Sequence, residues 1–245
     1  MTEQNSTPTI ILVNSQMGEN IGASARAMLN CGLVNLRLVS PKQGWPNDRA
    51  ESMSVGALDA MPPVEVFNSV EEASHDINTL YATTARKRDM VKPVMTPQAA
   101  VSDMFTRTSQ SEKVGVLFGG ERAGLDNRDV SFADNLISIP LNPEFSSLNL
   151  SQAVLLISYE WSKLTFDAPD IELVMKESPT ASGKEMTELY SRLETELQTH
   201  SFFRTPEMRP TMMNNIRSML SRTQMSSQEA KTFHGIISAL IGKKK

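Results

Sequence analysis

The sequence predicts an α/β fold with a mostly parallel sheet, followed by a C-terminal helical extension. Two observations support this prediction. Through the first two thirds of the 245 residues, short apolar runs alternate with helix-like segments. These runs lack the in-and-out alternation of a half-exposed strand, which favours strands buried on both faces of a parallel sheet. After residue 163 the alternation gives way to helical periodicity alone, which indicates a separate unit.

The elements of the first part follow one another in a regular order. Six runs are expected to form strands: Ile10–Val13, Leu36–Val39, Val64–Phe67, Leu80–Thr83, Val114–Phe118 and Leu136–Ile139. Four segments between or after them have helical character: Ile21–Cys31, Val70–Ile77, Pro97–Thr108 and Leu148–Lys163. A chain that alternates strands and helices in this way predicts helices packed on both faces of the sheet.

The remainder of the chain predicts a linker and three helices. Proline, serine and threonine interrupt any period near Pro169 and Pro179, so a linker is expected there. Ser226 and Glu229 have the spacing of a capping box, which marks the start of the third helix. The chain is therefore divided into an α/β domain (1–165), a linker (166–183) and a helical extension (184–245), with helices at 184–199, 206–222 and from 226 onward.

Composition excludes several classes of protein. The single cysteine, Cys31, excludes a disulfide framework and a cysteine-based zinc site, so no metal is expected. No run of about 18 apolar residues occurs and the N-terminus is polar, which predicts a soluble cytoplasmic protein without membrane association. The net charge of −4 would by itself argue against a nucleic-acid partner. However, residues 197–245 hold eight basic and two acidic side chains, so the C-terminal end is basic.

Three loops that follow expected strands carry the polar chemistry. The first, after residues 10–13, leads into a helix opened by Asn20 and Gly22, with Arg26 in its early turns. A capped helix start with a solvated arginine explains this spacing equally well. The lysine and hydroxyl pair of a phosphate loop is absent there.

The second loop reads Phe118-Gly-Gly-Glu-Arg-Ala-Gly-Leu125, and its glycines allow close approach of a ligand to the backbone. Its spacing differs from the GxGxxG of dinucleotide-binding proteins, which argues against a dehydrogenase. The third loop, Pro140 to Asn149, carries Ser146 and Ser147, which could cap the following helix, and an Asn149 expected to be buried. No GxSxG motif occurs and the three histidines lie elsewhere, which disfavours a serine nucleophile.

Taken in order, the segments Asn20–Arg26, Phe118–Leu125 and Asn142–Leu150 resemble the three motifs of the SpoU branch of the SPOUT RNA methyltransferases. The last of them, together with Ala82-Thr-Thr-Ala-Arg86, is most similar to bacterial tRNA ribose methyltransferases of that branch. The resemblance covers about residues 8–165, and three motifs in one order are a specific match. It implies a deep trefoil knot between about residues 80 and 150, S-adenosylmethionine as cofactor, and a homodimer.

The resemblance also implies roles for individual residues. Arg26, Asn20, Glu121 and Asn149 would be catalytic, with Arg26 reaching across the dimer. Whether Arg26 is a general base or a hydrogen-bond donor stays open, although a guanidinium pKa above about 12 favours the donor. Arg86 and Arg88 are expected to contact RNA phosphates, although a solvated loop is the commoner explanation of such a cluster. The expected cofactor-binding residues are Thr83, Thr84, Ala85, Gly119, Ile139, Ser146, Ser147 and Leu148.

The resulting expectation is methylation of a ribose 2'-hydroxyl in tRNA, at cytidine or uridine 32, the first nucleotide of the anticodon loop. The basic helical extension is expected to hold the RNA. Three alternatives remain open: ribosomal RNA as substrate, another tRNA position, and a non-catalytic RNA-binding module. The presence of Asn20, Arg26, Glu121 and Asn149 together speaks against the last alternative, because a pure binding module would not need all four.

Overall fold

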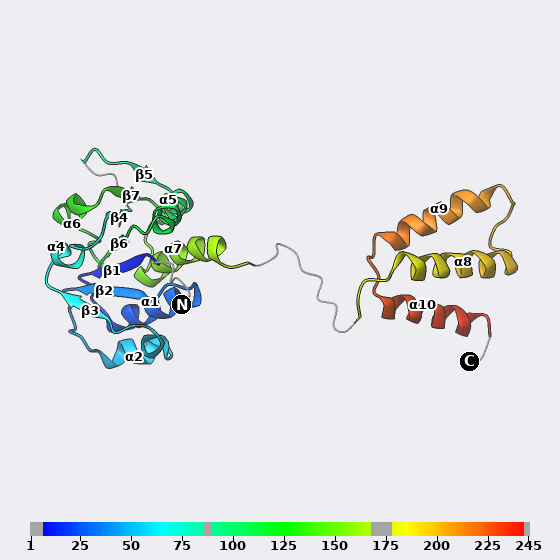
Figure 1. Ribbon diagram of the computed structural model, residues 1–245, viewed down its shortest axis with the longest axis horizontal. Coiled ribbons are helices and arrows are strands. Elements are labelled where there is room, and N and C mark those ends of the chain that lie inside the picture. The colour runs from blue at the N-terminus through cyan, green and yellow to red at the C-terminus, as the bar shows by residue number, and fades with distance from the viewer. Residues whose placement is uncertain (1–6, 86–89, 168–177, 243–245) are drawn as a thin grey trace. The chain divides into compact units, whose positions relative to one another are not determined.

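The chain forms two compact units, residues 1–168 and 169–245. The computed structural model describes residues 7–85, 90–167 and 178–242. The first unit is built on a seven-stranded sheet covered by helices, and the second consists of α-helices (Figure 1).

All strand pairs of the sheet are parallel, as the sequence predicts. The order is β3-β2-β1-β6-β4-β7-β5, so the first strand lies inside the sheet next to the sixth. The six expected strands are present, and β5 is a two-residue strand that the sequence did not reveal. The predicted trefoil knot stays a prediction. The strands are β1 (Thr9–Val13), β2 (Asn35–Val39), β3 (Glu65–Phe67), β4 (Thr79–Thr83), β5 (Val94–Met95), β6 (Val114–Gly119) and β7 (Asn135–Ile137).

Helices cover both faces of the sheet, because successive strand residues point to opposite sides. Ile10 and Leu12 of β1 pack in one apolar core, while Ile11 and Val13 pack in the other. The first core is shared with helices α1 (Gly18–Asn30), α2 (Asp48–Ser54), α3 (Ala57–Ala60), α5 (Pro97–Ser109) and α7 (Leu150–Thr165). The second is shared with α4 (Val70–Ala73) and α6 (Asn127–Phe132), which lie on the other side of the sheet (Figure 1).

Several helix boundaries differ from the prediction, and α1, for example, begins at Gly18 rather than at Ile21. Helix α4 ends at Ala73 rather than at Ile77, and Asp76 beyond it forms ion pairs with Arg37 and Lys113. Helix α7 begins at Leu150 and is capped by Asn149, so Ser146 and Ser147 do not cap it. The expectation that Asn149 is buried was also wrong, since the residue is exposed. As the N-cap it lies outside the helix, where its side chain reaches the free backbone N–H groups.

The second unit packs three helices around a small apolar core. Helices α8 (Gly183–Thr199), α9 (Met208–Ser221) and α10 (Ser227–Leu240) bury Leu189, Leu220 and Ile237 between them. The capping box of Ser226 and Glu229 is present as predicted. The end of the segment predicted as a linker belongs to this unit, because the N–H of Ala181 donates to the carbonyl of Met225.

Candidate functional site

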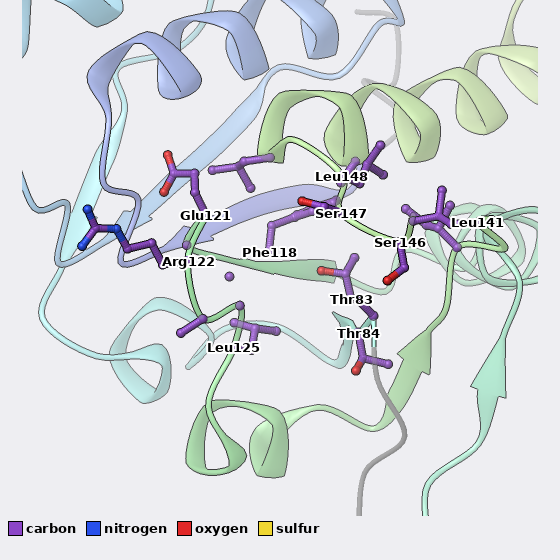
Figure 2. A pocket seen from close by; sticks show the side chains of 18 of the residues that line it. Thr83, Thr84, Phe118, Glu121, Arg122, Leu125, Leu141, Ser146, Ser147 and Leu148 are labelled. Atoms are coloured by element: carbon purple, nitrogen blue, oxygen red, sulfur yellow. The ribbon is translucent and has the colours of Figure 1, made fainter. Parts of the chain in front are cut away.

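The loops singled out by the sequence meet at one edge of the sheet. Because β1, β4, β6 and β7 are parallel, their carboxyl ends and the loops that follow them lie on the same side. Figure 2 shows Glu121 from the second loop, Ser146 and Ser147 from the third, and Thr83 and Thr84 from the end of β4 around one cavity.

A hydrogen-bonded network joins the first loop to the second. The carboxylate of Glu121 accepts hydrogen bonds from the backbone N–H groups of Gln16 (2.8 Å) and Met17 (3.3 Å). It also accepts one from the side-chain amide of Asn20, with a distance of 2.6 Å between Nδ2 and Oε1. Glu121 therefore fixes the loop after β1 against the glycine-rich loop after β6.

The third loop joins the same network through Asn149. Its Nδ2 donates to Oδ1 of Asn20 at 3.1 Å, while its Oδ1 accepts from the N–H of Ser151 at 2.9 Å. The second contact caps α7, and the first ties the start of α7 to the start of α1. Asn20, Glu121 and Asn149, chosen from three separate motifs, are thus brought into one chain of hydrogen bonds.

The ionisation of Glu121 reflects this environment. Burial alone would raise the pKa of its carboxyl group, but the hydrogen bonds from Asn20, Gln16 and Met17 outweigh burial and lower that pKa. Hydrogen bonds to the charged form favour ionisation, so Glu121 is a carboxylate at neutral pH. It therefore acts as an acceptor that holds the loops.

Arg26 is placed differently from the other three residues. It lies on the exposed face of α1 and does not line the cavity of its own chain. Within the described residues its guanidinium group has no hydrogen bond or ion pair. The structure of one chain therefore leaves this arginine accessible, and its predicted reach into a partner's site stays a prediction.

The cavity itself has a volume of about 410 Å³, which is in the range of small-molecule sites. All eight residues expected to bind the cofactor line it, and five of them are labelled in Figure 2. The side chain of Thr83 is fixed there, because its hydroxyl donates to the carbonyl of Leu117. Those eight residues come from the end of β4, the end of β6, and the loop after β7: Thr83, Thr84, Ala85, Gly119, Ile139, Ser146, Ser147 and Leu148.

Glycines are required where the second loop folds back on itself. A Cβ atom on Gly119 would lie 2.1 Å from the backbone of Gly124, and one on Gly120 would lie 2.5 Å from the carbonyl oxygen of Asn14. Both contacts are with backbone atoms, which cannot move aside as a flexible side chain can. A side chain at either position would therefore push the backbone segments apart and change the wall of the cavity.

Comparison with known proteins identifies the family. Residues 7–159, well over half of the chain, match the SpoU rRNA Methylase family. The chain belongs to the SpoU methylase family. Its cavity and the network around Glu121 therefore lie at the three motifs from which the resemblance was drawn.

Relatives of this SpoU family member cover nearly its whole length. It is 32% identical over 239 residues to the tRNA (cytidine/uridine-2'-O-)-methyltransferase TrmJ of Pectobacterium atrosepticum, covering 94% of this chain and 95% of the relative. Among solved structures, TrmJ from Z. mobilis ZM4 is 44% identical, with a TM-score of 0.81, covering 96% of this chain and 99% of that one.

A more distant SpoU protein shares the fold. The methyltransferase AviRb from Streptomyces viridochromogenes, solved in complex with AdoMet, is 22% identical with a TM-score of 0.54. That match covers 67% of this chain and 60% of the other. At this identity the likeness concerns the architecture of the sheet and its helices.

Several cavity residues escaped the sequence reasoning. Arg122 belongs to the glycine-rich motif, but only its glutamate and glycine neighbours were singled out. Leu141 lies beside the predicted Ile139, and Ala153 belongs to the first turn of α7, where only a known helix start could have revealed it. Glu121, predicted as a catalytic residue, also lines the cavity. The lining residues that were missed are Phe118, Gly120, Arg122, Ala123, Gly124, Leu125, Ile137, Leu141, Leu150 and Ala153.

Other expectations concern RNA, membranes and metals. Arg86 and Arg88, expected to contact RNA, lie outside the described residues. In the described parts of the chain, no helix combines the length and apolar character needed to cross a bilayer. The same parts contain no group of three or more histidine, cysteine, aspartate or glutamate side chains that could hold a metal ion.

Proposed function

We propose that this SpoU family member transfers a methyl group from S-adenosylmethionine to a ribose 2'-hydroxyl of tRNA in the cytoplasm, at cytidine or uridine 32. One observation carries the proposal. The eight residues expected to hold the cofactor line one cavity, and the bonded chain of Glu121, Asn20 and Asn149 lies beside it. The relatives that match over nearly the full length are named for this reaction on cytidine and uridine of tRNA.

The cavity fits the proposed cofactor in size and chemistry. When bound, S-adenosylmethionine supplies a methyl group activated by a positively charged sulfur. Ile139 and Leu148 offer apolar surface for its adenine ring, and the bare backbone at Gly119 leaves room for close approach. Ser146 and Ser147, which are not occupied in capping α7, present polar groups at the same wall.

The chemical task of the protein is alignment, because a ribose 2'-hydroxyl is a poor nucleophile at neutral pH. Holding the reacting atoms in line lowers the barrier, because the reaction no longer depends on a chance encounter in the correct orientation. Arg26 donates hydrogen bonds toward the 2'-oxygen and an adjacent phosphate, and so stabilises the charge that grows on the oxygen. Glu121, Asn20 and Asn149 act as positioning residues, since they hold the three loops together.

The proposed active form is a homodimer in which Arg26 serves the partner's cavity. Two features of the chain support this. Arg26 is exposed and outside the cavity of its own chain, and α7 presents an exposed apolar stripe of Leu155, Leu156 and Tyr159. Apolar stripes of this kind mark interaction surfaces. Light scattering on purified protein should give about twice the chain mass of 27.1 kDa, and a single-chain mass would contradict the dimer.

The proposed RNA contacts lie outside the cavity. On their sequence, Arg86 and Arg88 follow β4 and contact phosphates of the tRNA. The helical extension adds exposed cations, among them Arg204, Arg222 and Lys231. Phosphate contacts supply sequence-independent affinity and make it sensitive to salt.

The decisive experiment is a methylation assay with labelled S-adenosylmethionine. Purified protein should methylate bulk tRNA and not ribosomal RNA, and digestion of the product should give 2'-O-methylcytidine or 2'-O-methyluridine. Preference for ribosomal RNA would refute the proposed substrate, and a label on a base would refute the proposed acceptor. Mapping the modified nucleotide in tRNA from a deletion strain should show loss of the methyl group at position 32.

A further inference from the structure

Phe145 is an exposed aromatic side chain in an otherwise polar loop. It is 73% exposed, more than any other phenylalanine among the described residues. It stands in the run Asn142-Pro-Glu-Phe-Ser-Ser147, where it is the sole apolar aromatic group. An exposed aromatic ring offers a flat apolar face on which another ring can stack.

The position of Phe145 relates it to the cavity. Its chain neighbours Ser146 and Ser147 line the cavity, as does Leu141 four residues earlier (Figure 2). The turn that presents it is ordered by two hydrogen bonds of Asn142. The side chain of Asn142 accepts from the N–H of Glu144 at 3.0 Å, and its carbonyl accepts from the N–H of Phe145 at 3.0 Å. A preorganised turn loses little entropy when its exposed ring binds a partner.

The charges around the cavity indicate what that partner is. Residues 140–149 contain no lysine or arginine and include one acidic residue, Glu144. This loop therefore has no cation to attract an RNA phosphate, and the ring of Phe145 is a surface on which the face of a base can stack. The cation that lines the cavity, Arg122, lies at the opposite side of the cavity from Ser146 (Figure 2). Arg122 and the loop that carries Phe145 thus lie on opposite sides of the cavity.

We infer that Phe145 stacks on a base of the RNA substrate next to the target ribose and so positions that ribose at the cavity. The inference rests on the proposed function and adds a substrate-positioning residue to it. Single-stranded RNA is recognised largely by aromatic side chains that stack on unpaired bases. Stacking tolerates any base, because every base has a π-face, so Phe145 would set position without choosing between cytidine and uridine.

The test compares Phe145→Ala, Phe145→Leu and Phe145→Tyr in the full chain. Loss of a base stack should raise KM for tRNA by about tenfold or more in the alanine and leucine variants. The tyrosine variant should stay near the wild type, because its ring stacks equally well. Phe132→Ala, which removes a partly exposed phenylalanine from α6 outside the cavity lining, should leave KM unchanged. Cofactor affinity should be the same in all five proteins.

A second readout reports the stack directly. An anticodon stem-loop RNA with 2-aminopurine next to the target nucleotide should lose fluorescence on binding the wild type and the tyrosine variant, and not on binding the leucine variant. Unchanged KM in the alanine variant, or full activity in the leucine variant, would overturn the inference. The inference would also be overturned if light scattering gave a dimer for the wild type and a single chain for the alanine variant, since Phe145 would then contact a second copy. If the wild type methylates no RNA, the proposed function fails, and quenching alone decides whether the ring stacks.

Discussion

Glu121 illustrates how one side chain can hold separate loops of a site together. Its carboxylate accepts three hydrogen bonds from residues about a hundred positions earlier in the chain. Two of those donors are backbone N–H groups of the loop after β1, at Gln16 and Met17. A buried donor that loses its acceptor costs more free energy than the bond contributes, so the fold should be sensitive to the loss of this carboxylate.

Glu121→Gln should therefore destabilise the first unit and slow methyl transfer. Glutamine keeps one acceptor oxygen but places an NH₂ group against a donor, so at least one hydrogen bond is lost. We expect the free energy of unfolding to fall by about 1–2 kcal/mol at neutral pH. Urea unfolding followed by circular dichroism measures this, with Glu71→Gln on the surface of α4 as the control.

The effect of Glu121→Gln on stability should also depend on pH. In the folded protein the pKa of Glu121 is lowered from its usual 4.5, so its carboxylate stabilises the fold at pH values above 4.5. That contribution is lost as the pH falls through the lower, folded pKa. The difference in stability between wild type and Glu121→Gln should therefore be largest near neutral pH and shrink under acid. A difference that stays constant down to pH 3 would show that Glu121 is not held as a carboxylate.

Substitution of Arg26 should lower turnover without changing the free energy of unfolding. Within the described residues it has no hydrogen bond or ion pair, so Arg26→Lys should leave the free energy of unfolding unchanged. Lysine keeps the charge but loses the planar fork of donors, so turnover should fall by about tenfold or more. Arg49→Lys, at an exposed pair with Glu19, is the matched control and should change neither quantity. Near-normal turnover of Arg26→Lys would refute the proposed role.

At the scale of elements, the start of helix α7 contributes both to the stability of the fold and to the site. Its N-cap, Asn149, uses one side-chain atom to cap the helix and another to bind Asn20. The start of α7 is thereby fixed to the start of α1, and Leu150 and Ala153 of its first turn line the cavity. The two tasks of Asn149 can be separated by substitution.

Asn149→Ser should keep the cap and lose the link to Asn20, because serine caps helices about as well as asparagine. We expect its stability to stay within about 0.5 kcal/mol of the wild type, whereas Asn149→Ala should lose about 1 kcal/mol. Both variants should lose methyl transfer to a similar degree. Thermal unfolding and the methylation assay together measure this, and a fully active Asn149→Ser would show that the link to Asn20 is dispensable.

The sequence predicted the strands better than the short helices, for a physical reason. The runs around Ile10 and Val114 are almost entirely apolar, since their strands are buried on both faces. Helix α2 is polar and buries only Ala50 and Ser54, so it has no apolar period to detect. It is held instead by the cap of Asn47 and by its contact with α1, where the carbonyl of Ala50 faces Gly22.

The residues of the candidate site that stand in recognisable motifs could be predicted from the sequence. Asn20, Glu121 and Asn149 could be chosen because they stand in three recognisable loops, yet their bonds to one another depend on the sheet order. That order places β6 next to β1 although about one hundred residues separate them, and no local pattern encodes it. Arg122 and Phe145 were missed because a surface arginine and a loop phenylalanine carry no signal until the cavity beside them is known.

At the scale of the whole molecule, positive charge gathers in the C-terminal part of the second unit. The chain carries a net charge of −4, yet residues 197–245 hold eight basic and two acidic side chains. Several of the cations are exposed on the helical unit, including Arg204 and Arg222. A polyanion senses the local surface within a Debye length of about 8–10 Å, so the net charge of the chain does not prevent RNA binding.

This distribution of charge predicts that the first unit binds the cofactor and that the second unit supplies affinity for tRNA. A protein ending at residue 167 keeps α7 complete, including Phe166, whose ring lies close to Gly32. It should bind S-adenosylmethionine with the affinity of the full chain and lose most of its affinity for tRNA, with a smaller dependence on salt. Arg204→Glu combined with Arg222→Glu in the full chain should also weaken tRNA binding and leave cofactor binding unchanged.

Isothermal titration with cofactor measures cofactor affinity, and filter binding with tRNA at several salt concentrations measures tRNA affinity. If the truncated protein binds tRNA fully, the helical unit does not hold the RNA; if it loses the cofactor while the double variant keeps both ligands, the unit stabilises the first domain instead.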